Sequence, residues 1–155
     1  IWLISKMEDI KRVFMYHGAE HKTINCLEHG EDLTPENLKK YSRLHKRCGT
    51  SFLLIVMIVS IVVFMFIRVD SLVWKFVLRI LLVPVVAGIS YEFIRLAGRS
   101  DSKIVNTLSK PGLYLQYFTT REPDEEMMEV AIKAVEGVFD WREYLRAMHN
   151  GELED

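Results

Sequence analysis

Two histidines and a glutamate near the start of the chain have the spacing of a metal-binding helix. His17, Glu20 and His21 form the pattern His-x-x-Glu-His, which occurs in metal-dependent hydrolases. In a helix the two imidazoles lie one turn apart on the same face, where they can bind a single ion. Glu20 lies about 60° round the helix from His17, from where it could accept a proton from a metal-bound water. The alternative is a solvated helix face that carries two histidines by chance.

A second group of metal-ligand residue types stands further along the chain. His45 and Cys48 have a His-x-x-Cys spacing, which brings two donors to one side of a helical turn. Imidazole nitrogen and thiolate sulphur are the ligands that zinc prefers. We therefore expect His17, His21 and at least one of His45 and Cys48 to share a divalent metal ion, with zinc as the first choice.

Length, charge and cysteine content narrow the class of protein. The chain has 155 residues, half of them apolar, and a formal net charge of −1. One domain is expected at this length, and the charge balance gives no reason to expect nucleic acid as a partner. Two cysteines are too few for a disulfide framework. Cys26 projects to the side of the helix opposite His17, so we expect it to lie in a core rather than to bind the metal. The start at Ile1-Trp2-Leu3-Ile4 looks like the end of an upstream apolar segment, and we expect a fragment of a longer protein with no signal peptide pattern.

The metal motif is expected on a long helix over residues 7–29, because apolar residues recur there at helical spacing and Gly30 can end the helix. Gly18 weakens such a helix, but it could let another segment approach the backbone beside His17. Asn25 could hydrogen-bond to a metal ligand or contact the substrate. The alternative is that it is an ordinary polar residue of the helix. Thr34 and Pro35 then predict the start of a short helix that runs to about Leu44.

Two long apolar segments predict a membrane hairpin. Residues 52–67 are apolar except for Ser60, and together with Thr50 and Ser51 they can cross about 27 Å of hydrocarbon. A buried soluble helix is the alternative, but this chain has little else to cover a helix that is apolar all round. A tight connection at 68–71 leads to a second helix over 72–96. The distribution of basic residues favours cytoplasmic ends for the hairpin, with Lys39, Lys40, Arg43, Lys46 and Arg47 before it and Arg95, Arg99 and Lys103 after it.

Glu92 lies near the cytoplasmic end of the second predicted span, beside the expected position of Cys48 and Thr50. A carboxylate in a membrane span is costly unless it is paired, and it marks a functional site by default. Glu92 could bind the metal or orient a histidine, and the alternative is an ion pair with Arg95 three residues on. The Tyr91 hydroxyl could serve the same site, although tyrosines are also common interfacial anchors.

The last third of the chain is expected to be cytoplasmic. Residues 110–112, Lys-Pro-Gly, predict a turn. Residues 119–124 lead into a helix whose apolar stripe would form a docking face, made of Met127, Val130, Ala131, Ala134, Val135 and Val138. Residues 140–148 are expected to add a short helix. The sequence thus predicts an all-α, polytopic membrane protein of one domain, with metal-motif helices (1–49), a transmembrane hairpin (50–98) and C-terminal helices (99–155).

Several blocks of this sequence, in order, resemble the YqhQ-like family of bacterial membrane proteins. The blocks are Tyr16–Cys26, His45–Phe52, Gly88–Glu92 with Arg95–Arg99, Pro111–Leu113 and Thr119–Asp124, and the similarity extends from Met7 to about Val135. The resemblance implies a multi-pass protein of the cytoplasmic membrane, a metal-dependent enzyme, and a further N-terminal portion. It implies no particular substrate.

Three hypotheses of function follow. The first is a zinc-dependent hydrolase at the cytoplasmic membrane face, with Glu20 as general base and a membrane protein segment or lipid-like molecule as substrate. The second is a structural site closed by four protein ligands such as His17, His21, His45 and Cys48. The third is a transport or assembly subunit with Glu92 between helices. That role would require homo-oligomers or a membrane-protein partner, so a monomer in detergent would count against it.

Overall fold

The computed structural model describes residues 4–100 and 102–152, and within these ranges the chain is helical with no strand. The predicted all-helical class is therefore confirmed for the described residues, whereas Ile1–Leu3 of the expected upstream apolar segment lie outside them. The helices are η1 (Ile4–Lys6), α1 (Glu8–Glu28), α2 (Pro35–Leu38), α3 (Gly49–Met65), α4 (Leu72–Arg99), α5 (Lys103–Thr119), α6 (Glu125–Glu136) and α7 (Trp141–His149). They form two compact units: the first comprises the described residues up to His45 and those from Tyr117 onward, and the second is Lys46–Gln116.

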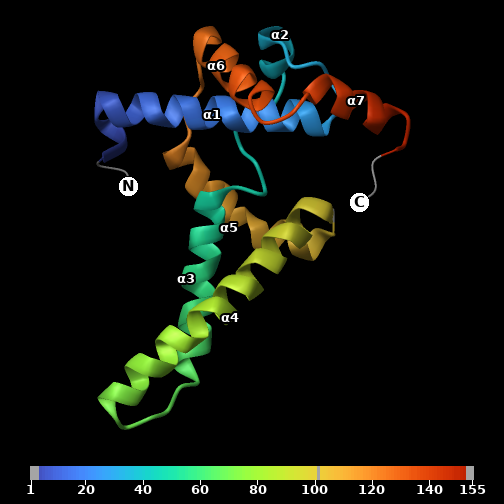
Figure 1. Cartoon of the computed structure of the whole chain (residues 1–155). Coiled ribbons are helices and arrows are strands. Elements are labelled where there is room, and N and C mark those ends of the chain that lie inside the picture. Colours follow the sequence, from blue (N-terminus) through green and yellow to red (C-terminus); the bar gives the residue numbers. More distant parts are fainter. Residues whose placement is uncertain (1–3, 101, 153–155) are drawn as a thin grey trace. The chain divides into compact units, whose positions relative to one another are not determined.

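The first unit is built along α1, as Figure 1 shows. Glu8 and Asp9 stand in its first turn, where negative charge is favourable against the helix dipole. The chain leaves the helix at Gly30, whose φ of 76° is in the left-handed region that glycine adopts readily. The helix predicted over 7–29 is confirmed to within one residue at each end.

The core of the first unit joins α1 to α6 and α7. Ten buried side chains form it: Ala19, Cys26, Leu27, Leu33, Leu38, Met127, Met128, Ile132, Trp141 and Leu145. Cys26 is fully buried and makes no disulfide, so its predicted place in a core is confirmed. Burial of the thiol raises its pKa to about 11, since a thiolate loses its hydration there.

The helix that Thr34 starts is shorter than predicted. The Thr34 hydroxyl does accept the backbone N–H of Asn37, and Pro35 is the first helical residue. The helix nevertheless ends at Leu38 rather than near Leu44. The reason lies in α1, because Lys22 and other α1 side chains bind the backbone carbonyls of residues 41–44 and hold that stretch out of a helix.

Helix α6 begins where predicted and turns part of the predicted apolar stripe to the core. The Asp124 carboxylate caps it by accepting the backbone N–H of Met127. Met128 and Ile132 are buried in the core, whereas Val130 and Val138 of the predicted stripe are 50% and 82% exposed. Of the predicted stripe, Met127 is buried in the core and Ala131 and Val135 pack against it. The prediction is therefore confirmed for these three residues, and the buried face extends to Met128 and Ile132 instead of to Val130 and Val138.

The second unit contains α3 and α4, which pack against each other, and most of α5. In the described part of the chain, α4 is the one helix that is long and apolar enough to cross a membrane, by length and composition. Helix α3 is apolar but has 17 residues. That both helices cross a bilayer stays a prediction.

The predicted turn at residues 110–112 is wrong, because α5 continues through Pro111. Gly112 lies against Ser51 of α3, where an added Cβ would be 2.8 Å from the Ser51 Oγ atom. One turn later, the fully buried Gln116 amide donates to the same hydroxyl at 2.7 Å. These contacts with α3 favour a continuous helix over the local signal of the Lys-Pro-Gly sequence.

Candidate metal centre

His17 and His21 lie one turn apart on α1, with ring centroids 4.3 Å apart. The His17 Nδ1 atom is 2.8 Å from the Thr119 carbonyl, and the His21 Nδ1 atom is 2.7 Å from the Arg43 carbonyl. A carbonyl oxygen only accepts, so each Nδ1 must carry the proton and donate it. Both rings are therefore held in the tautomer whose lone pair is on Nε2, as in metal-binding histidines whose other nitrogen donates to a carbonyl.

The loop of residues 39–45 is fixed to α1 by side chains of that helix. The Lys22 ammonium, 3% exposed, donates to the Tyr41 carbonyl at 2.8 Å. The Asn25 amide donates to the Ser42 and Leu44 carbonyls at 2.7 and 3.0 Å. Asn25 therefore binds the loop that supplies the carbonyl partner of His21.

The segment that follows α5 is held against the other side of the pair. Gly18 is buried, and a Cβ at this position would clash with the Arg121 carbonyl oxygen. The Arg121 backbone N–H donates to the Phe14 carbonyl at 2.8 Å. The expectation that Gly18 admits another segment beside His17 is thus confirmed. That segment directly follows Thr119, which is the last residue of α5 and the partner of His17.

Two ion-pairing side chains connect the loop and this segment. The Arg43 guanidinium donates to the carbonyl and the hydroxyl of Thr120 at 2.6 and 2.7 Å. Glu122 accepts from the buried Lys22 at 2.6 Å. The carbonyls that set both histidine tautomers therefore belong to stretches that are bound to each other as well as to α1.

His45 lies close to His21, with ring centroids 5.8 Å apart. It is 8% exposed, and its Nε2 atom is 3.2 Å from both carboxylate oxygens of Glu28. A carboxylate at this distance orients the ring and favours a proton on Nε2. His45 would then have to bind a metal through Nδ1, or through Nε2 after leaving Glu28.

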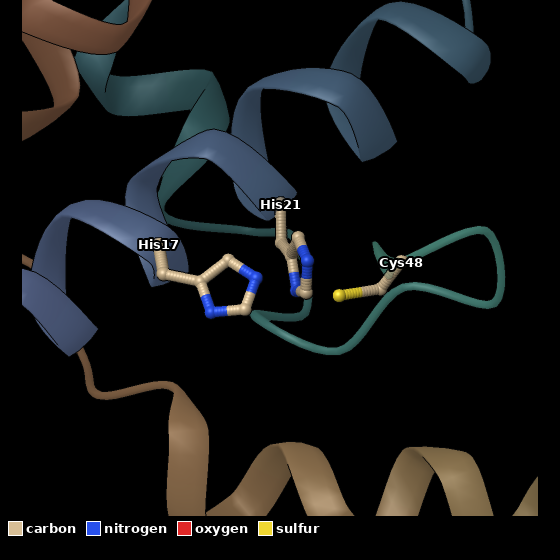
Figure 2. A group of neighbouring side chains, drawn as sticks. All are labelled: His17, His21 and Cys48. Carbon is tan, nitrogen blue, oxygen red and sulfur yellow. The ribbon is translucent and has the colours of Figure 1, made fainter. Parts of the chain in front are cut away.

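Cys48 joins the two α1 histidines in the one candidate metal group of the described residues. One ligand atom from each of His17, His21 and Cys48 lies within 4.8 Å of the others, and Figure 2 shows the thiol directed toward the His21 ring. The Cys48 sulphur also contacts the Thr50 hydroxyl at 3.2 Å.

The remaining predicted site residues are not in this group. The Glu92 carboxylate is 65% exposed and pairs with Arg95 at 3.5 Å, which is the alternative that the sequence offered. Tyr91 is 59% exposed. Glu20 lines a groove between α1 and α6.

Sequence reasoning did not include Glu28, the partner of His45, among the site residues. Glu28 lies eleven residues after His17, which is close to three full helical turns, so it is expected on the same face of the helix. This spacing was the signal in the sequence that could have identified it. The backbone partners at Arg43 and Thr119 carry no side-chain signal of this kind, because any residue has a carbonyl.

Together, the fold and the site define a chain whose described residues are helical, with α4 able to cross a membrane by length and composition and a His, His, Cys group earlier in the sequence. The chain belongs to the family described as Protein of unknown function (DUF1385), whose model matches residues 1–141. It is 46% identical over 135 residues to the uncharacterized protein YqhQ of Bacillus subtilis (strain 168), which covers 86% of this chain and 42% of that protein. The chain thus spans less than half the length of this relative. No solved structure matches it.

Proposed function

We propose that this protein is a zinc-dependent hydrolase with His17, His21 and Cys48 as metal ligands. The observation that carries the proposal is the pair of Nδ1–H bonds to backbone carbonyls, which set the lone pair of each ring on Nε2 before a metal arrives. Three protein ligands would leave one position of a tetrahedral ion for water, as catalytic zinc sites do. The ion would supply a water of lowered pKa.

We place this activity at the cytoplasmic face of a bacterial inner membrane. Helix α4 has the length and composition to cross a bilayer, and the 17 residues of α3 would extend over about 26 Å, close to the thickness of a thin bilayer. In this proposal both helices cross as a hairpin and the described ends of the chain are cytoplasmic. The substrate would be a membrane protein segment or a lipid-like molecule, since the proposed ligand Cys48 directly precedes α3 in the chain.

Two carboxylates are candidates to accept the proton from water. Glu20 directly precedes the ligand His21, and Glu28 is bound to the ring of His45. We assign the role to Glu20 because the His-x-x-Glu-His spacing places it beside both ligands. Glu20→Gln should keep the zinc and abolish turnover of quenched fluorescent peptides or short-chain phospholipids that the wild type cleaves. Full activity of Glu20→Gln together with loss in Glu28→Gln would transfer the role to Glu28.

Elemental analysis of the purified protein tests the metal itself. The wild type should carry about one zinc per chain, and His17→Ala should lose it. His29→Ala is the matched control: His29 follows the same helix, and its Nδ1 likewise lies 2.7 Å from a backbone carbonyl, but it is absent from the ligand group. Equal metal content in all three proteins would refute the ligand assignment.

A structural zinc site is the second candidate, and burial favours it. His21, Cys48 and His45 are 3%, 5% and 8% exposed, and a site closed by four protein ligands is typical of structural zinc. X-ray absorption at the zinc edge distinguishes the two functions. Three protein ligands and one oxygen support the hydrolase, whereas three nitrogens and one sulphur, with His45 as the fourth ligand, support the structural role.

A further inference from the structure

A groove between α1 and α6 takes no part in the ligand group. It encloses about 460 Å³, which is within the range of ligand-binding pockets. Its walls are mostly apolar: Ile24 comes from α1, and Ala131, Ala134 and Val135 come from α6. Val138, at the far end, is 82% exposed. Most of the apolar stripe that α6 was predicted to use for docking therefore lines this groove, and part of the same stripe also packs against the core.

A second hollow of about 490 Å³ continues the groove toward the start of α1, because Tyr16 and Val130 line both. Its wall is strongly polar. The charged side chains that line it are Glu8, Asp9, Lys11, Arg12, Asp124 and Glu126. Four carboxylates against two basic groups leave two net negative charges. We call the two hollows together the α1–α6 trench.

The negative charge of the trench is only partly neutralised from within. Lys11 pairs with Glu8 at 3.6 Å. The Arg12 guanidinium donates a hydrogen bond to Tyr16, and this bond, with nearby carboxylates, raises the pKa of Arg12. No ion pair within 4 Å is found for Asp9 or Glu126 among the described residues. An occupant with basic groups would therefore find unmatched carboxylates at this end.

The length of the trench favours a peptide over a small molecule. Its α1 wall runs from Glu8 to Ile24, a rise of about 24 Å at 1.5 Å per residue. A helix of roughly 16 residues would span that distance. The walls are helical and the described residues offer no strand edge, so a peptide would bind as a helix in a groove rather than by strand addition. The small Ala131 and Ala134 side chains let a third helix approach closely.

We propose that the α1–α6 trench binds a basic amphipathic helical segment of a partner protein. The apolar face of this segment would cover Ala131, Ala134 and Val135, and its lysine or arginine side chains would meet Asp9 and Glu126. None of the three proposed ligands lines the trench, whereas Glu20, the proposed general base, does. Peptide binding is measured without turnover, so failure of the zinc proposal would leave this one standing.

Fluorescence anisotropy with a designed peptide tests the proposal. The probe is a labelled 18-residue amphipathic peptide of leucine and lysine, added to the full chain in zwitterionic lipid nanodiscs, with empty nanodiscs subtracted. The same peptide with glutamate in place of lysine is the probe control. The lysine peptide should bind and the glutamate peptide should not, because the trench is acidic.

Two variants locate the binding in the trench. Ala134→Trp fills the apolar half and should weaken binding by about tenfold or more. The double variant Asp9→Lys, Glu126→Lys should do the same and reduce the dependence on salt. The matched control, Glu129→Lys with Glu143→Lys, makes the same change of charge at exposed positions outside the trench, and should bind within about twofold of the wild type.

Three outcomes would overturn the proposal. One is wild-type affinity in both trench variants, and another is equal weakening in the matched control. The third is a dimeric wild type that Ala134→Trp converts to a monomer, which would make the trench a contact between copies of this chain. Far-ultraviolet circular dichroism checks folding, and the exposed charge variants remain informative if Ala134→Trp does not fold.

Discussion

Replacing Gly18 with alanine should damage both the fold and the metal centre. In an exposed helix interior this change stabilises by about 1 kcal/mol, since alanine has the higher helix propensity. Here a Cβ would clash with the Arg121 carbonyl oxygen and would lie 3.2 Å from the Arg121 carbonyl carbon and 3.5 Å from the Pro123 Cδ atom. The first two are backbone atoms, so relief requires the whole segment to move away from α1.

The size of the effect follows from what that movement disturbs. Overpacking of a tight site costs about 1–3 kcal/mol. The Arg121 N–H bond to Phe14 and the His17 bond to Thr119, both 2.8 Å long, flank the clash, and each is worth about 1 kcal/mol. After subtraction of the propensity gain, we expect Gly18→Ala to lower the free energy of unfolding by about 3 kcal/mol. For a chain of this size that corresponds to a fall in Tm of roughly 6–12 °C.

Gly88 provides the matched control for this measurement. It lies inside α4, and no heavy atom would be within 4 Å of a Cβ added there. Thermal unfolding followed by circular dichroism should therefore show Gly18→Ala below the wild type and Gly88→Ala at or slightly above it. Zinc affinity should fall in Gly18→Ala alone, because the partner of the His17 Nδ1 moves. A Gly18→Ala protein with wild-type Tm and zinc affinity would refute the close approach.

Three further outcomes are expected from the supports of the site. Asn25→Ala leaves the Ser42 and Leu44 carbonyls without their donor, so it should destabilise by about 2 kcal/mol and weaken zinc binding in titrations; unchanged binding would contradict its positioning role. Lys22→Met leaves the Tyr41 carbonyl without its donor and should destabilise by about 2 kcal/mol, measured by urea unfolding. Burial raises the folded-state pKa of Cys26 to about 11. The stability that the buried thiol contributes is therefore fully present below about pH 9, and it is lost as the pH rises through 11. Urea midpoints should fall over that range, and less so in Cys26→Ala.

Local signals in the sequence were sufficient for the starts of several helices. Thr34 and Asp124 cap α2 and α6 through their own side chains, and Gly30 ends α1 with a positive φ. These interactions join residues two to four positions apart, so they can be recognised from spacing alone. The same holds for the long apolar segments of α3 and α4, whose composition determines a helix without regard to partners.

The errors in the predicted fold come from distant contacts that override local preferences. The stretch after Leu38 is not helical because Lys22 and Asn25 bind its carbonyls. Helix α5 passes through Pro111 because Gly112 packs on Ser51. In each case the decisive partner is at least 16 residues away, and a pattern of neighbouring residues contains no information about it.

The difference between local signals and distant contacts also applies to the candidate site. The pairing of His17 and His21 follows from helical geometry, whereas their tautomers depend on carbonyls from two remote stretches. A carbonyl is present whatever side chain a residue has, so no residue type marks these partners in a sequence. What the sequence does specify is the approach of the two stretches, through Gly18 on one side and Asn25 on the other. Gly18 and Asn25 thus control the tautomers of His17 and His21 without being proposed ligands. Their substitution therefore tests whether the two histidines form the proposed metal site or share a helix face by chance.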